Sequence, residues 1–470
     1  MKLKNFDLTE TVNKIRRQLE EENISSSLKS LIEILLFIVV QMTERLSLNS
    51  KNSSKPPSSD INRNKKKKGK PKRKPGGQPG RVGTQLKPVN DPDEVKIIKI
   101  NKKNLPKDSY TDGGYETRQV MDFIISTNIT EYRAEVLINS KGKRYVADFP
   151  SFVKRPIQYG PKIKANSVYM SQFQLIPYAR IQDYFSEQIG INLSPGSIFN
   201  FNQEAYEVLS MFEKAAKENL INSHCINVDE TSININGKRL WLHTACNDKW
   251  TYFYPHQKRG SEAMDEINIL PQFKGVLCHD HWKAYYKYKC KHSLCNSHHL
   301  RELEWCATED KQKWAEKMRV FLTKLNGKVI SAGGKLSSQQ STYYHRRYKK
   351  LLEEGDQECP SPDPKKGKRG RVKKSKSRNL LERLMNFRYD VLRFMDDAEV
   401  PFTNNQGEND LRMTKVQQKI SGCFRSEEGA YIFCRIRAYL ITCRKHGVGA
   451  TEALEGLFSG KLPNFIKHRF

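Results

Sequence analysis

The stretch Cys225-Ile226-Asn227-Val228-Asp229-Glu230-Thr231-Ser232 decides the fold of the second half of the chain. Its short apolar run ends on the carboxylate of Asp229, and a second apolar run, 240–245, follows Asn236-Gly237. An Asn-Gly pair between two such runs is typical of a tight β-hairpin. The sequence therefore predicts a hairpin whose first strand carries Asp229.

Two further carboxylates follow downstream. An apolar run at 275–278 leads to Asp280, and Glu408 opens a helical segment after Asn404-Asn405. Around the aspartates, strands are expected at 249–255, 275–278 and 293–297, and helices at 261–270 and 282–289. We interpret residues 221–470 as a ribonuclease H-like α+β core with a helical insertion at about 310–400. In this arrangement the first and fourth strands lie side by side, so Asp229 faces Asp280.

The composition limits the class of protein. The 470 residues carry a formal net charge of +30, and an excess this large favours a polyanionic partner over a merely solvated surface. All ten cysteines lie at or beyond Cys225, which is typical of reduced thiols rather than a disulfide framework. The longest apolar run, 34–40, is too short to cross a bilayer, and the N-terminus lacks a signal-peptide pattern. We expect a cytoplasmic, nucleoid-associated protein without a membrane partner.

The first part of the chain divides into an N-terminal helix (1–48) and a disordered basic linker (49–90). The heptad spacing within the helix is equally consistent with a dimerising coiled coil and with a helix packed on its own core. Its seam consists of Leu28, Leu31, Leu35, Ile38 and Met42. The linker gains most from phosphate contacts, although it also suits a plain solvated tether. Its candidate DNA-binding residues are Lys65, Lys66, Lys67, Lys68, Lys70, Lys72, Arg73 and Lys74.

Two domains are expected between the linker and the core. Alternating runs at 95–100 and 134–138 predict a small β domain of several strands over 91–155. Residues 156–220 show helical segments at 162–173 and 179–189, a turn at Gly190, and a third helix after Ser194-Pro195. This succession is typical of a helix-turn-helix domain that binds DNA, although many small helical domains share it.

The three carboxylates suit phosphodiester chemistry. Together they are a minimum for holding two Mg²⁺ (or Mn²⁺) ions, which prefer oxygen ligands. The plain alternative is that each is a surface or capping group. On a helix, Glu408 shares one face with Arg412, Lys415 and Lys419, which predicts phosphates along that face rather than only a surface Glu–Arg pair.

His298 and Arg301 follow the fifth predicted strand. Both are candidates for contact with substrate or metal-bound phosphate. The spacing of Cys290, Cys295 and His298 favours buried thiols over a zinc site.

Several motifs resemble transposases of the insertion sequence 66 family. They include residues 51–60, Pro75-Gly76-Gly77-Gln78-Pro79-Gly80, Val228-Asp229-Glu230-Thr231, Cys295-Asn296-Ser297-His298 and Asn404-Asn405-Gln406-Gly407-Glu408. The resemblance implies an Asp-Asp-Glu transposase whose triad is Asp229, Asp280 and Glu408. It also implies a zinc module ahead of the helical domain. Residues 90–150 contain no cysteine, so no zinc is expected, and Thr403 and Asn409 replace residues that the family often has as Asp and Arg.

These observations favour one function over two others. The favoured function is a transposase that binds terminal inverted repeats, cleaves 3′ ends and joins them to target DNA. Because two ends must meet, an oligomer such as a homodimer is expected, with or without accessory proteins of the element. The alternatives are a catalytically inactive end-binding repressor and a nuclease that cuts without joining. The intact triad argues against the repressor.

Overall fold

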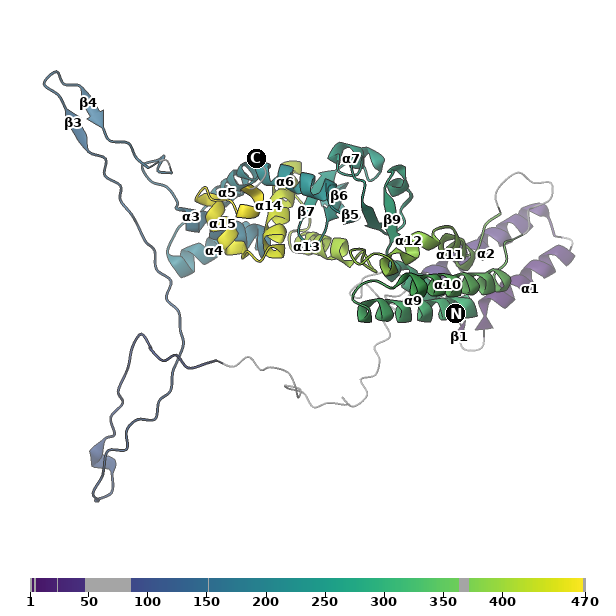
Figure 1. The fold of residues 1–470 in the computed structure, drawn as a ribbon, viewed down its shortest axis with the longest axis horizontal. Helices are drawn as coiled ribbons and strands as arrows, with labels where there is room; N and C mark the ends of the chain where they lie inside the picture. The colour runs from purple at the N-terminus through teal and green to yellow at the C-terminus, as the bar shows by residue number, and fades with distance from the viewer. Residues whose placement is uncertain are drawn as a thin grey trace. The chain divides into compact units, whose positions relative to one another are not determined.

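The computed structural model describes residues 2–3, 6–22, 24–46, 86–150, 152–362 and 372–467. The candidate DNA-binding residues at 65–74 lie outside this described part. The chain divides into two compact units, residues 64–133 and residues 1–63 with 134–470. The smaller unit contains the short 3₁₀ helix η2 (Lys102–Asn104). All other elements named below belong to the larger unit (Figure 1).

The N-terminal segment forms two helices where one was expected. Strands β1 (Lys2–Leu3) and β2 (Phe6–Asp7) precede α1 (Leu8–Glu21) and α2 (Ser26–Leu46). Val12 and Leu19 of α1 bury against Leu36 of α2. The predicted heptad seam lies on other faces of α2, with side chains between 41% and 61% exposed. The two helices therefore pack on each other through residues outside the predicted seam. Dimerisation through the seam stays a prediction.

The region 91–155 differs from the expected β domain. Its described residues contain one hairpin, β3 (Val136–Ile138) with β4 (Arg144–Val146). The apolar side chains remain in solvent; Ile98 is 91% exposed and Ile124 94%. The prediction of several strands is wrong because the alternating runs find no second layer to cover their apolar face, and a lone hairpin buries little surface.

The helical region that follows matches the prediction closely. Helix α3 (Pro161–Val168) continues into the π-helix η3 (Tyr169–Phe173), and α4 (Tyr178–Tyr184) continues into the π-helix η4 (Phe185–Ile189). After a turn at Gly190, α5 (Pro195–Val208) begins, followed by α6 (Ser210–Ile221). Ser194 caps α5, because its Oγ accepts from the backbone N of Ser197 at 3.1 Å. Binding of DNA by this region stays a prediction.

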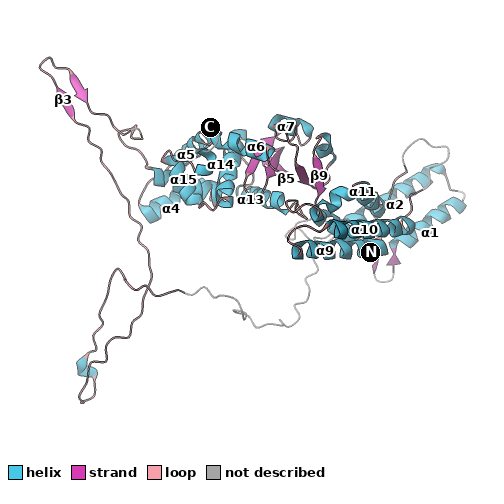
Figure 2. Cartoon of the chain, viewed as in Figure 1, coloured by secondary structure: helices cyan, strands magenta, loops and turns pink. Residues whose placement is uncertain are grey.

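A five-stranded mixed sheet follows, with strand order β7-β6-β5-β8-β9 (Figures 1 and 2). β5 pairs antiparallel with β6 and parallel with β8, so the expected adjacency of the first and fourth strands is confirmed. Asn236 and Gly237 both have positive φ, 47° and 81°, as a type I′ hairpin turn requires. The strands are β5 (Cys225–Ile235), β6 (Lys238–Cys246), β7 (Thr251–His256), β8 (Val276–His279) and β9 (Lys291–Leu294).

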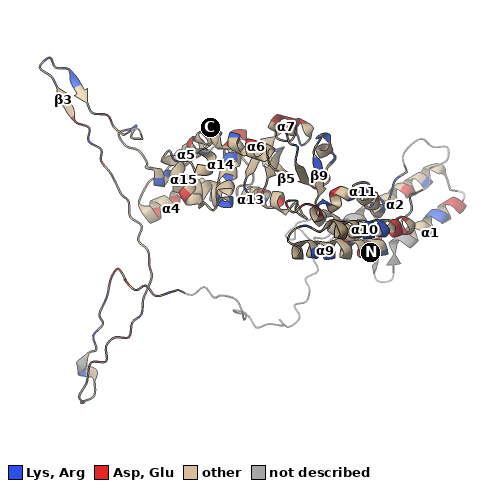
Figure 3. Cartoon of the chain, in the orientation of Figure 1, with Lys and Arg blue, Asp and Glu red and all other residues tan. Residues whose placement is uncertain are grey.

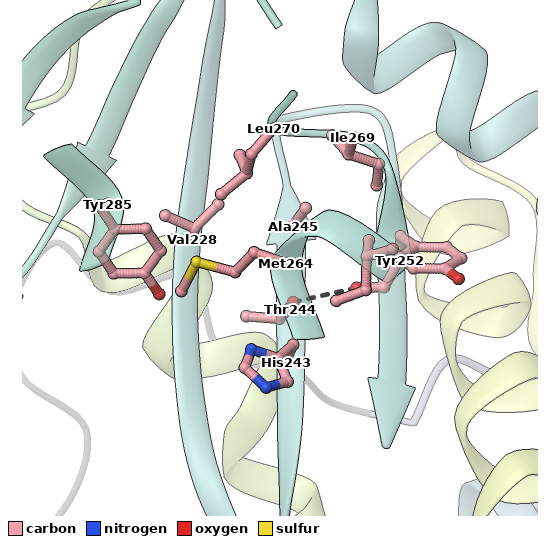
Figure 4. A pocket seen from close by; sticks show the side chains of 10 residues that line it. Val228, His243, Thr244, Ala245, Tyr252, Met264, Ile269, Leu270 and Tyr285 are labelled. Atoms are coloured by element: carbon pink, nitrogen blue, oxygen red, sulfur yellow. Dashed lines mark hydrogen bonds between the residues drawn. The ribbon is translucent and has the colours of Figure 1, made fainter. Parts of the chain in front are cut away.

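Helices cover both faces of this sheet. On one face lie α13 (Asn405–Ser421), which packs on β5, and α14 (Glu427–Lys445), which packs on β7. On the other lie α7 (Ser261–Ile267) and the 3₁₀ helix η5 (Lys283–Lys287). Figure 4 shows the apolar pocket on this second face, where Met264 and Tyr285 meet Val228. Since side chains alternate along a strand, Asp229 belongs to the α13 face and Glu230 to the α7 face.

The predicted insertion is helical, and its core also includes Val276 of β8 and Leu294 of β9. It contains α9 (Lys313–Ser331), α10 (Ser338–Glu358), α11 (Lys376–Asn386), α12 (Arg388–Leu392) and η6 (Arg393–Met395), preceded by α8 (Asn296–Thr308). Trp314, Tyr348 and Leu381 are buried at its centre. The fifth strand was expected at 293–297, but β9 ends at Leu294 because α8 begins at Asn296.

The last helices return to the helical region. α14 packs against α5, and α15 (Ala450–Phe458) packs against α3; α16 (Asn464–Lys467) follows. Val168, Ile226 and Leu440 consequently share one hydrophobic core, which extends across the boundary expected at 220. Among the described helices, none combines the length and apolar character needed to cross a membrane.

Candidate active site

Two of the predicted carboxylates lie at neighbouring strands: Asp229 within β5, and Asp280 directly after the last residue of β8. The parallel pairs of β5 and β8 run from Cys225 with Val276 to Asn227 with Cys278. The same offset places Asp229 level with Asp280, two residues beyond the last pair, and adjacent strands lie about 4.8 Å apart. Asp229 Oδ1 accepts from the backbone N of Glu230 at 2.9 Å. Asp280 Oδ1 accepts from the backbone N of Trp282 at 3.0 Å.

The third carboxylate, that of Glu408, is positioned by Asn404, the residue directly before α13. The buried amide of Asn404 accepts from Asn227 Nδ2 at 2.8 Å and donates to the carbonyl oxygen of Val228 at 2.8 Å. Its backbone N donates to Cys295 Sγ at 3.1 Å. A Cβ added at Gly407 would lie 3.5 Å from Asp229 Cβ, so the first turn of α13 packs directly on Asp229. Glu408 is thereby held near enough to Asp229 for its charge to raise the pKa of that aspartate.

The electrostatics show that these acidic groups act on one another. Burial, and then the charges of Glu230, Asp280 and Glu408, raise the pKa of Asp229 well above its usual range. Glu408 Oε1 is buried and has no hydrogen-bond partner within the described residues. Crowded carboxylates with an unsatisfied oxygen are a donor set that suits a hard divalent cation such as Mg²⁺.

A second group of possible ligands shares Glu408. The ligand atoms of Cys295, His298 and Glu408 all lie within 4.8 Å of one another. A thiolate is a soft ligand that suits zinc rather than magnesium. Burial raises the pKa of the Cys295 thiol, and its sulfur already accepts from the backbone N of Asn404. In this structure Cys295 therefore helps to hold Asn404.

His298 and Arg301 lie in the first two turns of α8, and a ring nitrogen of His298 lies within 4.8 Å of a carboxylate oxygen of Glu408. Burial, followed by the charge of Arg301, lowers the pKa of His298, so its imidazole is neutral near pH 7. Its Nδ1 is buried without a hydrogen-bond partner in the described chain. His298 thus lies close to Glu408, and the charge of Arg301 acts on His298. The contact of both residues with substrate or DNA stays a prediction.

The predicted basic face of α13 is only partly available. Arg412 and Lys419 are exposed. Lys415 instead donates to the backbone carbonyl of Ser232 on β5, and burial lowers its pKa. This face of α13 therefore also packs on the sheet, which the helical spacing alone does not reveal. Elsewhere on the described ribbon, Lys and Arg are interspersed with Asp and Glu (Figure 3).

The sequence reasoning missed Arg259 and Tyr285, which both bond Glu230. One signal for them was available: Glu230 follows Asp229 on a strand, so it faces the opposite side of the sheet. A carboxylate that is buried there requires a cationic or hydrogen-bonding partner.

Replacing Asn404 with alanine is expected to destabilise the chain by about 2–4 kcal/mol. The variant leaves the amide of Asn227 and the carbonyl of Val228 buried without partners, and each such group costs about 1–3 kcal/mol. Urea unfolding followed by circular dichroism measures the change. The exposed neighbour Asn405 supplies the control, and Asn405→Ala should change the free energy of unfolding by less than about 1 kcal/mol. Similar losses in the two variants would contradict the role of Asn404.

Two family models match parts of the chain. Residues 7–87 match a family of unknown function, DUF6444. No curated protein matches the chain. The Transposase IS66 family matches residues 156–432, a span that contains β5, β8 and the whole of α13. Because this match covers more than half of the chain, the protein belongs to the Transposase IS66 family.

Proposed function

We propose that this protein is an Asp-Asp-Glu transposase of a prokaryotic insertion sequence, which binds terminal inverted repeats, cleaves the 3′ ends and joins them to target DNA. The observation that carries the proposal is the convergence of Asp229, Asp280 and Glu408 from β5, the end of β8 and the start of α13. The strand order and directions of the sheet support a ribonuclease H-like core. Family membership supports a DNA-processing enzyme.

The three carboxylates are proposed to hold two Mg²⁺ (or Mn²⁺) ions. Such ions, when bound, activate the attacking oxygen and stabilise the leaving oxygen. Asp229, whose pKa is raised by the charges of both other carboxylates, is the proposed shared ligand. Asn404 fixes the helix that carries Glu408, and His298 and Arg301 are proposed to bind a phosphate oxygen.

DNA is the proposed partner on several surfaces. Arg412 and Lys419 offer exposed cations beyond the carboxylates, and the linker lysines add phosphate contacts that weaken as salt rises. We further propose that the chain acts as a homodimer or larger oligomer, since two ends must be joined to one target. Its expected place of action is the cytoplasm, on nucleoid DNA.

A strand-transfer assay separates the candidate functions. Purified full-length protein is incubated with Mg²⁺, labelled inverted-repeat DNA and a target plasmid. The expected result is 3′ cleavage and joined product for the wild type, and DNA binding without either product for Glu408→Gln. Binding without cleavage by the wild type would favour the inactive repressor. Cleavage without joining would favour the nuclease.

Removal of divalent cations is expected to abolish cleavage while the protein stays folded. Dialysis against EDTA should leave circular dichroism unchanged, and added Mg²⁺ or Mn²⁺ should restore product, because the three carboxylates offer oxygen ligands. Zinc should not substitute at the same concentration. Full cleavage in EDTA would exclude the two-metal proposal.

A further inference from the structure

Behind Asp229, on the α7 face of the sheet, one arginine is paired with a buried carboxylate. The side chain of Glu230 is 1% exposed. Its Oε1 accepts from Nε and Nη2 of Arg259 at 2.9 and 2.6 Å, and its Oε2 accepts from the hydroxyl of Tyr285. Arg259 lies between β7 and α7, and Tyr285 lies in η5 after β8. This network therefore ties the strand of Asp229 to the segment that follows Asp280.

The same guanidinium is stacked between two indoles. Arg259 Cζ lies 4.9 Å from the ring centroid of Trp241 on β6 and 4.4 Å from that of Trp282. Trp282 is the residue whose backbone N donates to Asp280 Oδ1 at 3.0 Å. Arg259 thus holds the residue that orients the carboxylate of Asp280.

The backbone between Asp280 and Trp282 needs such support. His281 has a φ of 75°, in the left-handed region that residues other than glycine rarely adopt. A conformation of this kind persists only where the surroundings impose it. Two contacts follow His281 in the chain: Trp282 stacks on Arg259, and the hydroxyl of Tyr285 donates to Glu230. Together they hold this segment against β5.

We propose that Arg259 is a positioning residue which, through Glu230, Trp282 and Tyr285, fixes the carboxylate of Asp280 relative to that of Asp229 and thereby sets the affinity of the site for divalent cations. Arg259 bonds neither aspartate in this arrangement. The inference rests on the proposed function of the carboxylates. Because the Arg259 side chain is 40% exposed, its free edge also suits a direct contact with DNA, which is the competing outcome.

The test uses the full-length chain with inverted-repeat DNA and measures the Mg²⁺ concentration that gives half-maximal cleavage. Arg259→Met should raise this concentration by about 10- to 100-fold, as loss of partners behind metal ligands does elsewhere. Arg259→Lys, which keeps the charge but not the planar stacking, should show a smaller rise. DNA affinity should match the wild type. Arg319→Met is the matched control, since Arg319 is 35% exposed and also pairs with glutamates.

Two results would overturn the proposal: an unchanged Mg²⁺ requirement, or weakened DNA binding as the sole effect. If Arg259→Met does not fold, Tyr285→Phe decides, because it removes only the hydroxyl that bonds Glu230. If the wild type does not cleave, the proposed function fails separately. Binding of Mn²⁺, followed by electron paramagnetic resonance, then still tests the positioning role: weaker binding by Arg259→Met supports it, and equal binding contradicts it.

Discussion

Replacing Asp229 with asparagine is expected to lower the rate of strand cleavage by about 10³-fold or more, a loss typical of removing a central catalytic group. Asparagine keeps the size of the side chain and the oxygen that accepts from the backbone N of Glu230. It removes the charge that a shared ligand of two cations must supply. Affinity for inverted-repeat DNA should remain within about twofold, because the exposed cations Arg412 and Lys419 are unchanged.

The same substitution should stabilise the metal-free protein. The folded-state pKa of Asp229 lies above its unfolded value, so the wild type loses stability as the pH rises from the unfolded pKa through the folded one. Asparagine does not ionise and avoids this loss. Without divalent cations, Asp229→Asn should therefore have the higher Tm at pH 7. Saturating Mg²⁺ should raise the Tm of the wild type substantially and that of Asp229→Asn little.

Differential scanning fluorimetry and the cleavage assay together check both effects. The exposed Asp248, in the turn between β6 and β7, gives a matched control of the same chemistry. Asp248→Asn should leave the cleavage rate and the Tm close to those of the wild type. Cleavage by Asp229→Asn within about tenfold of the wild type would contradict its place as a shared ligand.

The sequence predicted the parts of the site that local patterns encode. Asn236-Gly237 between apolar runs marks the hairpin, and an apolar run ending near Asp280 marks β8. Two parallel strands with one offset then place the aspartates level without further information. Ser194-Pro195 likewise marks the start of α5, because a cap followed by proline is a local signal.

The remainder depends on contacts between residues far apart in the sequence. Asn404 bonds Asn227 across 177 positions, and no periodicity predicts that partner. Lys415 has the spacing of a solvent-facing cation, yet the sheet beneath α13 turns it towards Ser232. The run at 95–100 has strand periodicity, but its isoleucines are exposed and no strand is assigned there, because the pattern alone does not supply a covering layer.

Asp410→Ala is expected to lower the free energy of unfolding by about 3–5 kcal/mol. This is the usual effect of removing one partner of a buried ion pair and leaving the other charge unpaired. Asp410 Oδ2 accepts from Lys445 Nζ and Thr251 Oγ1, each at 2.8 Å. The Lys445 and Asp410 side chains are only 10% and 8% exposed. In Asp410→Ala the ammonium of Lys445 keeps the carbonyl of Asn247 but loses its counter-charge.

Urea unfolding measures this effect, and two further variants identify its cause. Asp410→Ala with Lys445→Met removes both charges and should recover part of the loss, since a buried pair replaced by apolar groups is often tolerated. Glu354→Ala breaks the exposed pair with Lys317 and should leave the free energy of unfolding close to that of the wild type. Because the buried pair ties α13 to α14 and β7 two residues after Glu408, its loss should also slow cleavage. A stable Asp410→Ala protein would mean that Asn404 alone suffices to hold Glu408 in place.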